Sequence, residues 1–336
     1  MPDPFLADMR LDALRAWLAA VLATRDFTLA PASSDASFRH YFRVTPSAPG
    51  AVPRIAMDAP PGREDCRPFV HVADLLAKAG VNAPRVLEAD LEHGFLLLTD
   101  LGQRTYADVL DDANADRLYL DALDALVRWQ CSTREGTLAA YDDALLRSEL
   151  ALFPEWYLAR HLGITPATGE REALAAAFDL LIANNLAQPQ VYVHRDFHSR
   201  NLMDCTPNPG VLDFQDAVIG PITYDLVSLL RDAYVEWPEE RELDWVIRYW
   251  ERARTAGLPV SGDFAIFFRD YEWMGMQRHL KVLGIFARLW HRDGKDRYLA
   301  DMPRVMGYLR RAASRYRAFD PLRRTLDAFD SRAERR

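Results

Sequence analysis

Cysteine is scarce in this sequence, and its few positions form no ligand pattern. The 336-residue chain contains only Cys66, Cys131 and Cys205, an odd number at spacings that no zinc site uses. A disulfide framework and a structural zinc site are therefore not expected. The sparse use of cysteine indicates a reducing, cytoplasmic compartment.

Long apolar runs, leader-like segments and repeats are also missing. No stretch of 18 apolar residues occurs, and the opening MPDPFLADMR lacks an apolar core. We therefore expect neither a membrane-spanning helix nor a signal peptide. No internal repeat or low-complexity segment is evident either.

The composition that is present is that of a globular protein with uneven charge. Apolar residues make up 49% of the chain and charged residues 27%. Residues 1–240 carry 20 basic and 36 acidic side chains, whereas residues 241–336 carry 21 basic and 13 acidic ones. The basic end could suggest nucleic acid, but its charges alternate with acids in helical patterns such as LDWVIRYWERAR. Solvated helix faces are therefore favoured, and no nucleic-acid partner is expected.

Residues 1–99 predict a small, strand-rich lobe. Apolar residues at helical spacing predict a helix over 10–24, and the alternation in FRHYFRV predicts one strand of a hairpin whose turn is 33–37. The other elements predicted here are a strand near 53–57, a helix that ends at Gly80, and strands at 85–90 and 95–100.

From about residue 105 onward the pattern is helical, with one exception. The short β-rich stretches QVYV at 190–193 and GVLDF at 210–214 flank polar loops. The length exceeds that at which one hydrophobic core stops growing, which predicts two lobes. We therefore predict an α+β protein with an antiparallel-sheet N-terminal lobe (1–99), a hinge (100–104) and a helical C-terminal lobe (105–336).

The strongest chemical signal is the segment HRDFHSRN at 194–201, followed twelve residues later by Asp213 within VLDFQD. Asp196 follows a predicted strand, Asn201 comes five residues later, and Asp213 ends the next strand. Phosphoryl transfer requires one carboxylate to orient the attacking hydroxyl, and oxygen ligands to hold magnesium on the phosphates. The spacing of the three residues is typical of kinase catalytic and metal loops.

This pattern resembles the aminoglycoside-phosphotransferase and choline-kinase branch of the protein-kinase-like superfamily. The resemblance covers nearly the whole chain, because the order of the lobes, the hinge and the helical second lobe also agree. It implies a bilobal protein-kinase-like fold and the use of ATP and Mg²⁺.

Longer stretches are similar to bacterial cell-wall amino-sugar kinases. They include ASSDASFRHYFRV, MDAPPGREDCRPFV, LDFQDAVIGPITYDLVSLLRDAY and QRHLKVLGIFARLWHRDGK. This resemblance implies phosphorylation of N-acetylmuramate or N-acetylglucosamine at the anomeric hydroxyl, in peptidoglycan recycling. The expected partner is a small amino sugar, and no membrane partner is expected.

The resemblance also implies roles for individual residues. Asp196 is similar to the catalytic base, and Asn201 and Asp213 resemble the magnesium ligands. His194 and Asp225 resemble residues that support the catalytic loop, although Asp225 could instead cap the helix that it begins. The segment that resembles the adenine-reading hinge consists of Thr99, Asp100 and Leu101.

Two departures concern the nucleotide phosphates. The hairpin turn contains no glycine, although small residues could still let backbone N–H groups approach a phosphate; Ser34, Ser37 and Phe38 are the candidates. Family members commonly carry a lysine on the third strand, where this chain has Met57. We expect another cation to compensate, with Arg43 as first choice and Arg54 as second, although Arg43 could equally be a solvated strand residue.

The substrate residues are the least defined. A polycationic aminoglycoside requires a carboxylate-rich site, whereas the last 96 residues are net positive. An arginine could hold the lactyl carboxylate of N-acetylmuramate with two hydrogen bonds. Candidate substrate residues are His198, Arg231, Trp237, Arg278 and Lys281, although His198 could simply lie on the loop and Trp237 in the core.

Other functions stay open at this point. The chain could phosphorylate a different small hydroxyl compound, such as choline, homoserine or an aminoglycoside. It could also be a nucleotide-binding pseudokinase that acts as a scaffold, a reading that the missing lysine favours and that Asp196, Asn201 and Asp213 oppose.

Overall fold

The structure is a computed structural model that describes residues 4–33 and 38–333. The chain divides into two compact units. The first unit contains Met1–Arg104 and Met203–Asp216, and the second contains Thr105–Leu202 and Ala217–Arg336. The first boundary falls at the end of the predicted hinge, and a segment distant in sequence, 203–216, packs with the first unit.

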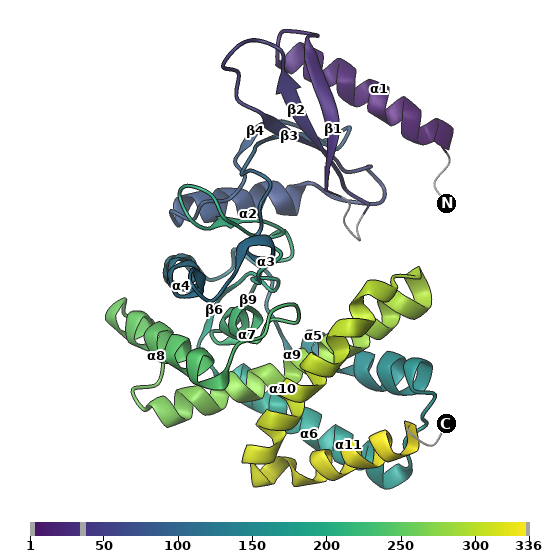
Figure 1. The fold of residues 1–336 in the computed structure, drawn as a ribbon, viewed down its shortest axis with the longest axis vertical. Helices are drawn as coiled ribbons and strands as arrows, with labels where there is room; N and C mark the ends of the chain where they lie inside the picture. Colours follow the sequence, from purple (N-terminus) through teal and green to yellow (C-terminus); the bar gives the residue numbers. More distant parts are fainter. Residues whose placement is uncertain (1–3, 34–37, 334–336) are drawn as a thin grey trace. The chain divides into compact units, whose positions relative to one another are not determined.

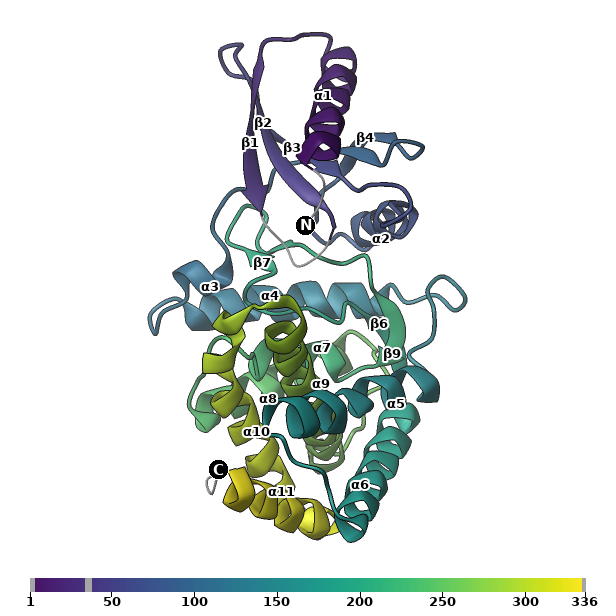
Figure 2. The same ribbon diagram turned by 90° about the vertical axis from the view of Figure 1, so that its right-hand side faces the viewer.

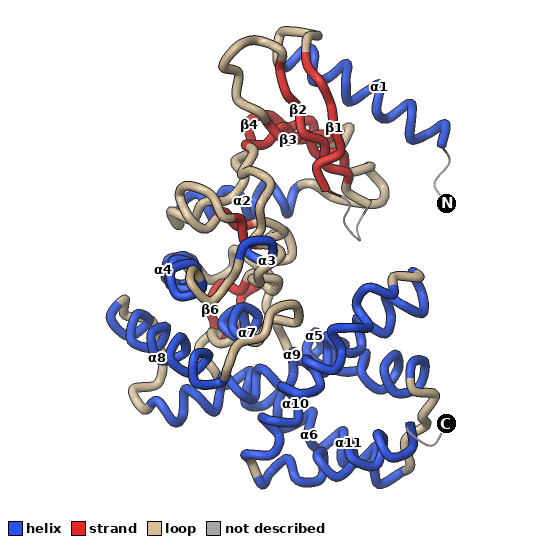
Figure 3. Tube along the Cα trace, viewed as in Figure 1, coloured by secondary structure: helices blue, strands red, loops and turns tan. Residues whose placement is uncertain are grey.

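The first unit is built on an antiparallel sheet whose strands follow the order β1-β2-β3-β5-β4. Figure 3 shows its strands in red. The elements of this unit are α1 (Pro4–Val21), β1 (Phe27–Ser33), β2 (His40–Pro46), β3 (Arg54–Asp58), α2 (Arg67–Lys78), β4 (Val86–Asp90), β5 (Phe95–Thr99) and β8 (Gly210–Val211).

One face of this sheet packs against α1 (Figure 1). The core on this side contains Val44, Ala56 and Leu97, together with Leu14 and Leu18 from the helix. The helix ends earlier than the predicted 10–24 because Ala23 adopts a left-handed backbone conformation, with φ of 51°. Because side chains alternate along a strand, every second residue of β2 faces α1 and the others lie on the opposite face.

The opposite face carries the side chains of alternate residues. Tyr41 pairs with Met57 across β2 and β3, and Met57 pairs with Leu96 across β3 and β5. Directly paired residues of a sheet project to the same side. Tyr41, Met57 and Leu96 therefore share the face that α1 does not cover.

The segment 203–216 is tied to the first unit by hydrogen bonds and ring packing. The backbone N–H of Val211 donates to the carbonyl of Asn82 at 2.7 Å, and the side chain of Asn82 donates to the carbonyl of Pro207 at 2.6 Å. The ring of Phe214 packs on that of Phe69 in α2, with centroids 4.6 Å apart. Of the predicted stretch 210–214, only Gly210–Val211 is a strand, and it pairs with β7 (Leu202–Met203).

The second unit is mainly helical. Its elements are α3 (Tyr106–Val109), α4 (Ala115–Cys131), α5 (Asp143–Leu152), the π-helix η1 (Phe153–His161), α6 (Thr168–Ala187), β6 (Gln190–Val193), β9 (Val218–Pro221), α7 (Tyr224–Leu230), α8 (Glu239–Thr255), α9 (Phe264–Asp293), the 3₁₀-helix η2 (Asp296–Asp301), α10 (Met302–Arg315), the 3₁₀-helix η3 (Arg317–Phe319) and α11 (Asp320–Ala333).

Helix α9 organises this unit, because it contacts α5, α6, α7, α8 and α10. It begins at Asp263, whose side chain accepts a hydrogen bond from the N–H of Ala265, and it ends at Gly294 in the left-handed conformation. Such a cap and stop are typical of helix ends. β6 and β9 form a two-stranded antiparallel pair next to α7 (Figure 2). Across the two described ranges, no helix combines the length and the apolar character needed to cross a bilayer.

Candidate active site

The segment 194–201 forms a loop between β6 and β7, and α7 holds its beginning. The carboxylate of Asp225 accepts hydrogen bonds from the backbone N–H groups of His194, at 2.6 Å, and Arg195, at 2.9 Å. Asp225 is fully buried, and burial raises its pKa to about 7 even though both N–H groups favour the ionised form. Helix α7 follows the cap residue Thr223, so Asp225 lies inside the helix rather than capping it.

Asp196 and Asn201 are joined within this loop. The Asn201 side chain donates through Nδ2 to the carbonyl oxygen of Asp196 at 3.0 Å. The backbone N–H of His198 also donates to that carbonyl, at 3.1 Å, and the N–H of Asn201 donates to the carbonyl of His198 at 2.9 Å. These bonds fix the loop and define which end of the Asn201 carboxamide is the nitrogen.

Arg195 lies in a strained backbone conformation that a buried acid stabilises. Its φ is 77°, in the left-handed region that residues with a side chain rarely adopt. Its guanidinium donates to Glu149 Oε1 at 2.6 Å, and Lys281 Nζ lies 2.8 Å from the same oxygen. Glu149 thus connects the catalytic loop to α9.

The surroundings of Asp196 keep its carboxylate ionised. Burial alone would raise its pKa, but the positive charge of Lys281, together with that of Arg278, lowers it below its ordinary value. His198 itself has a lowered pKa, because burial outweighs the attraction of Asp232 and Asp196. The loop therefore presents a charged carboxylate beside a neutral imidazole.

Asp213 belongs to the first unit, where its position is set by α2 through the neighbouring Phe214. Its φ is 63°, a second strained position, and its Oδ1 accepts a hydrogen bond from Gln215 at 2.9 Å. The oxygens of a carboxylate and a carboxamide, as in Asp213 and Asn201, are the donors that Mg²⁺ prefers. The donor chemistry therefore fits magnesium.

Arg43, on β2, forms an ion pair with the hinge residue Asp100. Its Nε lies 2.6 Å from Asp100 Oδ2, and its second nitrogen donates to the carbonyl of Gly102 at 2.8 Å. Arg43 is therefore held at the hinge by Asp100 and Gly102, and its assignment to the nucleotide phosphates stays a prediction. Thr99 holds the entry to the hinge, since its hydroxyl accepts from the N–H of Arg85 at 2.9 Å. Leu101 packs near Gly210.

Of the three candidates in the predicted hairpin turn, Ser34 and Ser37 lie outside the described residues. Phe38 is exposed, and Arg63 stacks on its ring at 4.7 Å. At the predicted lysine position, Met57 is completely buried. Close to the turn, Arg39 forms an ion pair with Glu64 at 3.0 Å, and both side chains are largely buried.

Two predicted substrate residues have structural partners instead. Arg231 is 0% exposed, and its guanidinium contacts Glu242 at 2.6 Å and Glu272 at 3.1 Å. Trp237 packs against Tyr119 and donates its ring N–H to the Tyr119 hydroxyl at 2.9 Å. Arg231 is thus held by two buried acids and Trp237 by an aromatic neighbour, and the assignment of either residue to the substrate stays a prediction.

Arg278 and His198 are placed differently. Arg278 is 5% exposed, its Nε is buried without a hydrogen-bond partner, and it contributes to the electrostatics of both Asp196 and His198. The ring of His198 packs edge-on against the ring of Tyr234. The guanidinium of the exposed Arg200 stacks on the same tyrosine ring, 3.5 Å from its centroid. These groups gather around the catalytic loop within the second unit.

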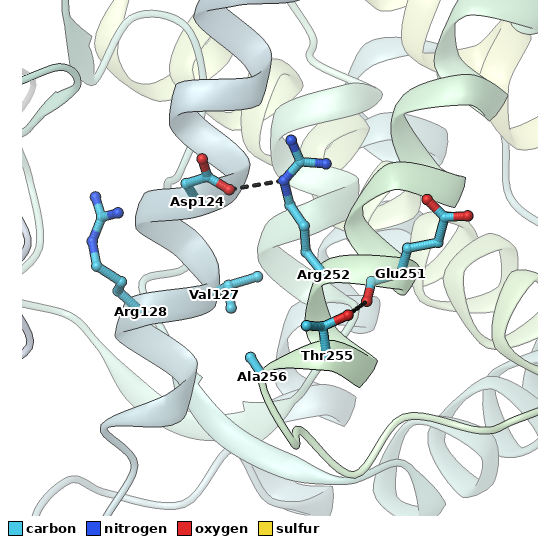
Figure 4. Close-up of a pocket in the computed structure, with 7 residues that line it drawn as sticks. All are labelled: Asp124, Val127, Arg128, Glu251, Arg252, Thr255 and Ala256. Carbon is cyan, nitrogen blue, oxygen red and sulfur yellow. Dashed lines mark hydrogen bonds and ion pairs between the residues drawn. The ribbon is translucent and has the colours of Figure 1, made fainter.

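A surface hollow of about 410 Å³ lies elsewhere on this unit, between α4 and the end of α8. Figure 4 shows that Asp124 and Arg252 bridge it with an ion pair, at 2.8 Å. None of the residues that line it is a predicted catalytic or binding residue. The hollow therefore adds nothing to the site.

Sequence reasoning missed two residues that hold the catalytic loop and one ion pair near the predicted turn. Glu149 lies in α5, 47 residues before Asp196, within the ordinary helical pattern LLRSELAL. Asp232 accepts a hydrogen bond from the N–H of Ser199 at 2.9 Å, and Arg39 pairs with Glu64. Only Asp232 had a detectable signal, because it lies in the stretch TYDLVSLLRD, two residues after Leu230.

Comparison with known proteins gives a consistent picture. The model of the phosphotransferase enzyme family matches residues 28–260. A protein of Pseudomonas aeruginosa named N-acetylmuramate/N-acetylglucosamine kinase is 57% identical over 290 residues, covering 85% of this chain and 84% of the relative. A protein of the same name from Pseudomonas putida is 50% identical over 318 residues, covering 92% and 93%.

The fold has counterparts among solved structures. A choline/ethanolamine kinase family protein from Mesorhizobium loti matches with a TM-score of 0.58 at 16% identity, covering 94% of this chain and 98% of that one. At this identity the likeness concerns the fold alone. The α+β, protein-kinase-like fold predicted from the sequence is confirmed.

Proposed function

This chain belongs to the phosphotransferase enzyme family, and on that premise we propose that it is an ATP-dependent kinase of amino sugars. It transfers the γ-phosphate of MgATP to the anomeric hydroxyl of N-acetylmuramate or N-acetylglucosamine and gives the sugar 1-phosphate. The names of relatives 50–57% identical to it support this substrate class. We place the reaction in the cytoplasm, in the reuse of cell-wall sugars.

Asp196 acts as the base in this proposal. Its carboxylate is ionised by its positive surroundings, and its backbone is fixed by the bonds to Asn201 and His198. An anomeric hydroxyl is more acidic than an ordinary alcohol, so a carboxylate with a low pKa can accept its proton as the bond to phosphorus forms. Positioning the hydroxyl is therefore the main task of Asp196.

Asn201 and Asp213 would hold magnesium through their side-chain oxygens. When bound, the ion neutralises charge on the transferring phosphate. The hydrogen bond from Asn201 Nδ2 to Asp196 keeps the carboxamide in one orientation, and the bond from Gln215 does the same for Asp213. Thr99, Asp100 and Leu101 would present backbone groups to adenine.

Arg39, in its ion pair with Glu64, is our candidate to compensate for the missing third-strand lysine. It replaces Arg43, which Asp100 and Gly102 occupy. Arg39 immediately precedes β2 next to the predicted phosphate-binding turn, and Glu64 leads into α2. A guanidinium can contact a carboxylate and a phosphate oxygen through different N–H groups.

The electrostatics disfavour an aminoglycoside as substrate. Positive charge surrounds the catalytic loop. It comes from Lys281, Arg278 and the exposed Arg200. A polycation would be repelled there, whereas a neutral or carboxylate-bearing sugar would not. We therefore rank the amino sugars above the antibiotics.

One observation carries the proposal: Asp196 and Asn201 are bonded into a single loop anchored by Asp225. The test incubates the protein with MgATP and each amino sugar and identifies the product by phosphorus NMR. We expect a sugar 1-phosphate from both sugars, and no reaction with choline or an aminoglycoside. Phosphate at any other hydroxyl, or turnover confined to choline, would refute the proposal.

A variant sharpens this test. Asp196→Asn should lower kcat by about 10²- to 10⁴-fold while the protein stays folded, because general-base assistance is worth that much. The matched control is Asp179→Asn, which alters an exposed carboxylate of α6 and should leave kcat unchanged. Near-normal turnover by Asp196→Asn would remove Asp196 from its assigned role.

A further inference from the structure

Arg278 is anomalous among the buried arginines of the second unit. It is 5% exposed, its Nε has no hydrogen-bond partner, and it makes no ion pair with a carboxylate of the described residues. Arg231, on the neighbouring α7 end, is equally buried but contacts Glu242 and Glu272. Burying a charge is costly unless a partner compensates for it. An anionic ligand is the missing partner that would explain Arg278.

The other cations near the catalytic loop are already engaged. Lys281, one turn further along α9, lies 2.8 Å from Glu149 and donates to the Tyr224 hydroxyl at 2.9 Å. Arg195 is held by Glu149 as well. Among the buried cations around Asp196, Arg278 is therefore the one whose donors are not occupied by an acid within the described part of the chain.

The position of Arg278 suits a group attached to the sugar. Its guanidinium lies 5.9 Å from the ring of Tyr224, the residue next to the loop anchor Asp225. It also acts electrostatically on Asp196, His198 and Tyr234. A sugar whose anomeric hydroxyl meets Asp196 would bring its other substituents toward this cluster.

The two sugars named for the relatives differ in one charged group. N-acetylmuramate carries a lactyl ether that ends in a carboxylate, and N-acetylglucosamine has a hydroxyl at that position. We propose that Arg278 is a specificity-determining residue that binds the lactyl carboxylate of N-acetylmuramate through its guanidinium; this inference rests on the proposed function. The planar guanidinium matches a carboxylate with two parallel hydrogen bonds.

The first test needs no variant. The methyl ester of N-acetylmuramate keeps the sugar and the ether but has no negative charge. We expect the wild-type protein to show a kcat/KM for the ester that is roughly ten- to hundredfold below that for N-acetylmuramate, mainly through KM. Equal values for acid and ester would overturn the proposal, whatever the stability of any variant.

The second test asks whether Arg278 is the partner. Arg278→Gln should lower the ratio of kcat/KM between N-acetylmuramate and N-acetylglucosamine by roughly ten- to hundredfold and abolish the preference for acid over ester. Arg278→Lys should restore part of the ratio, because it keeps the charge but loses the planar fork. Melting curves check that both variants fold. A smaller fraction of active protein would lower kcat/KM for both sugars equally, so it would not change the ratio between them.

Arg288→Gln is the matched control. Arg288 lies on the same helix, and its Nε also lacks a partner, but its electrostatic neighbours are Arg292, Asp293 and Glu155 rather than Asp196. It should leave the ratio unchanged. If Arg278→Gln lowers kcat/KM equally for both sugars, Arg278 serves the phosphate or the fold, and the proposal fails. A loss of the ratio in Arg200→Gln instead would likewise refute it.

Failure of this inference is distinguishable from failure of the proposed function. If the wild-type protein phosphorylates neither sugar, the function is wrong. If it phosphorylates both but does not discriminate acid from ester, only the assignment of Arg278 is wrong.

Discussion

Asp196 owes its ionised state to side chains that are far away in the sequence. Burial pushes its pKa up, and Lys281 is the first of the groups that lower it below the ordinary value. Lys281 itself is buried and has a raised pKa, because Tyr224 and Glu149 stabilise its charge against desolvation. The base and its charge partner are therefore coupled across α9 and the catalytic loop.

This coupling predicts a shift in the pH profile. Lys281→Met removes the charge that lowers the pKa of Asp196, so that pKa should rise. Because Asp196 must be deprotonated to act as the base, the acid limb of kcat/KM should move to higher pH, with a smaller loss of activity well above that limb. The measurement is kcat/KM across the acidic range, with Lys295→Met as control. An acid limb that stays in place or moves to lower pH would contradict the assigned coupling.

At the scale of elements, the close packing of α9 against α5 depends on one glycine, Gly284. A Cβ built on Gly284 would lie 2.5 Å from the backbone carbon of Leu152, at the end of α5. Backbone cannot move aside as a flexible side chain can. Gly284 therefore lets α9 and α5 pack closely, and this contact also positions Glu149, which lies in the last turn of α5.

Gly284→Ala should consequently destabilise the protein by about 1–3 kcal/mol, the usual penalty of overpacking. The expected result is a lower midpoint in thermal or urea unfolding. Gly307→Ala provides the control, because Gly307 lies in helix α10 and nothing lies within 4 Å of its would-be Cβ. That variant should be neutral or stabilised by about 0.5–1 kcal/mol. If Gly284→Ala has the same unfolding midpoint as the wild type, α5 can shift to make room for the added methyl group, and the prediction is wrong.

Local pattern predicted the elements better than it predicted the site. The alternation in β2, the turn at Gly94 and the stop at Gly80 are local signals, and β2, β4, β5 and α2 follow them closely. Glu149 and Arg39 could not be found in this way, because their roles arise from ion pairs with residues far away in the sequence or across a turn. The same limit explains Arg43 and Arg231: the sequence shows a cation but not the acid that occupies it.

At the scale of the whole molecule, the two compact units contain different parts of the proposed chemistry. Arg39, Glu64, Asp213 and the hinge residues belong to the first unit, and Asp196, Asn201 and Arg278 belong to the second. The charge imbalance between residues 1–240 and 241–336 has a structural explanation as well. Several arginines of the basic end pair with acids of residues 1–240, as Arg332 does with Glu170 and Arg252 does with Asp124.

This division predicts that nucleotide and sugar recognition can be perturbed separately. Arg39→Gln should raise the KM for ATP by about tenfold, because it removes a charged donor, worth about 1.5 kcal/mol, from the proposed phosphate site. The preference for N-acetylmuramate over its methyl ester should persist, since Arg278 is untouched. Steady-state kinetics with each substrate varied in turn measures both quantities. Arg67→Gln, which alters an exposed arginine of α2, is the control and should change neither. If Arg39→Gln leaves the KM for ATP unchanged, Arg39 does not compensate for the missing lysine and Arg54 becomes the candidate. If Arg39→Gln also abolishes the preference for N-acetylmuramate over its methyl ester, nucleotide and sugar recognition are not separable.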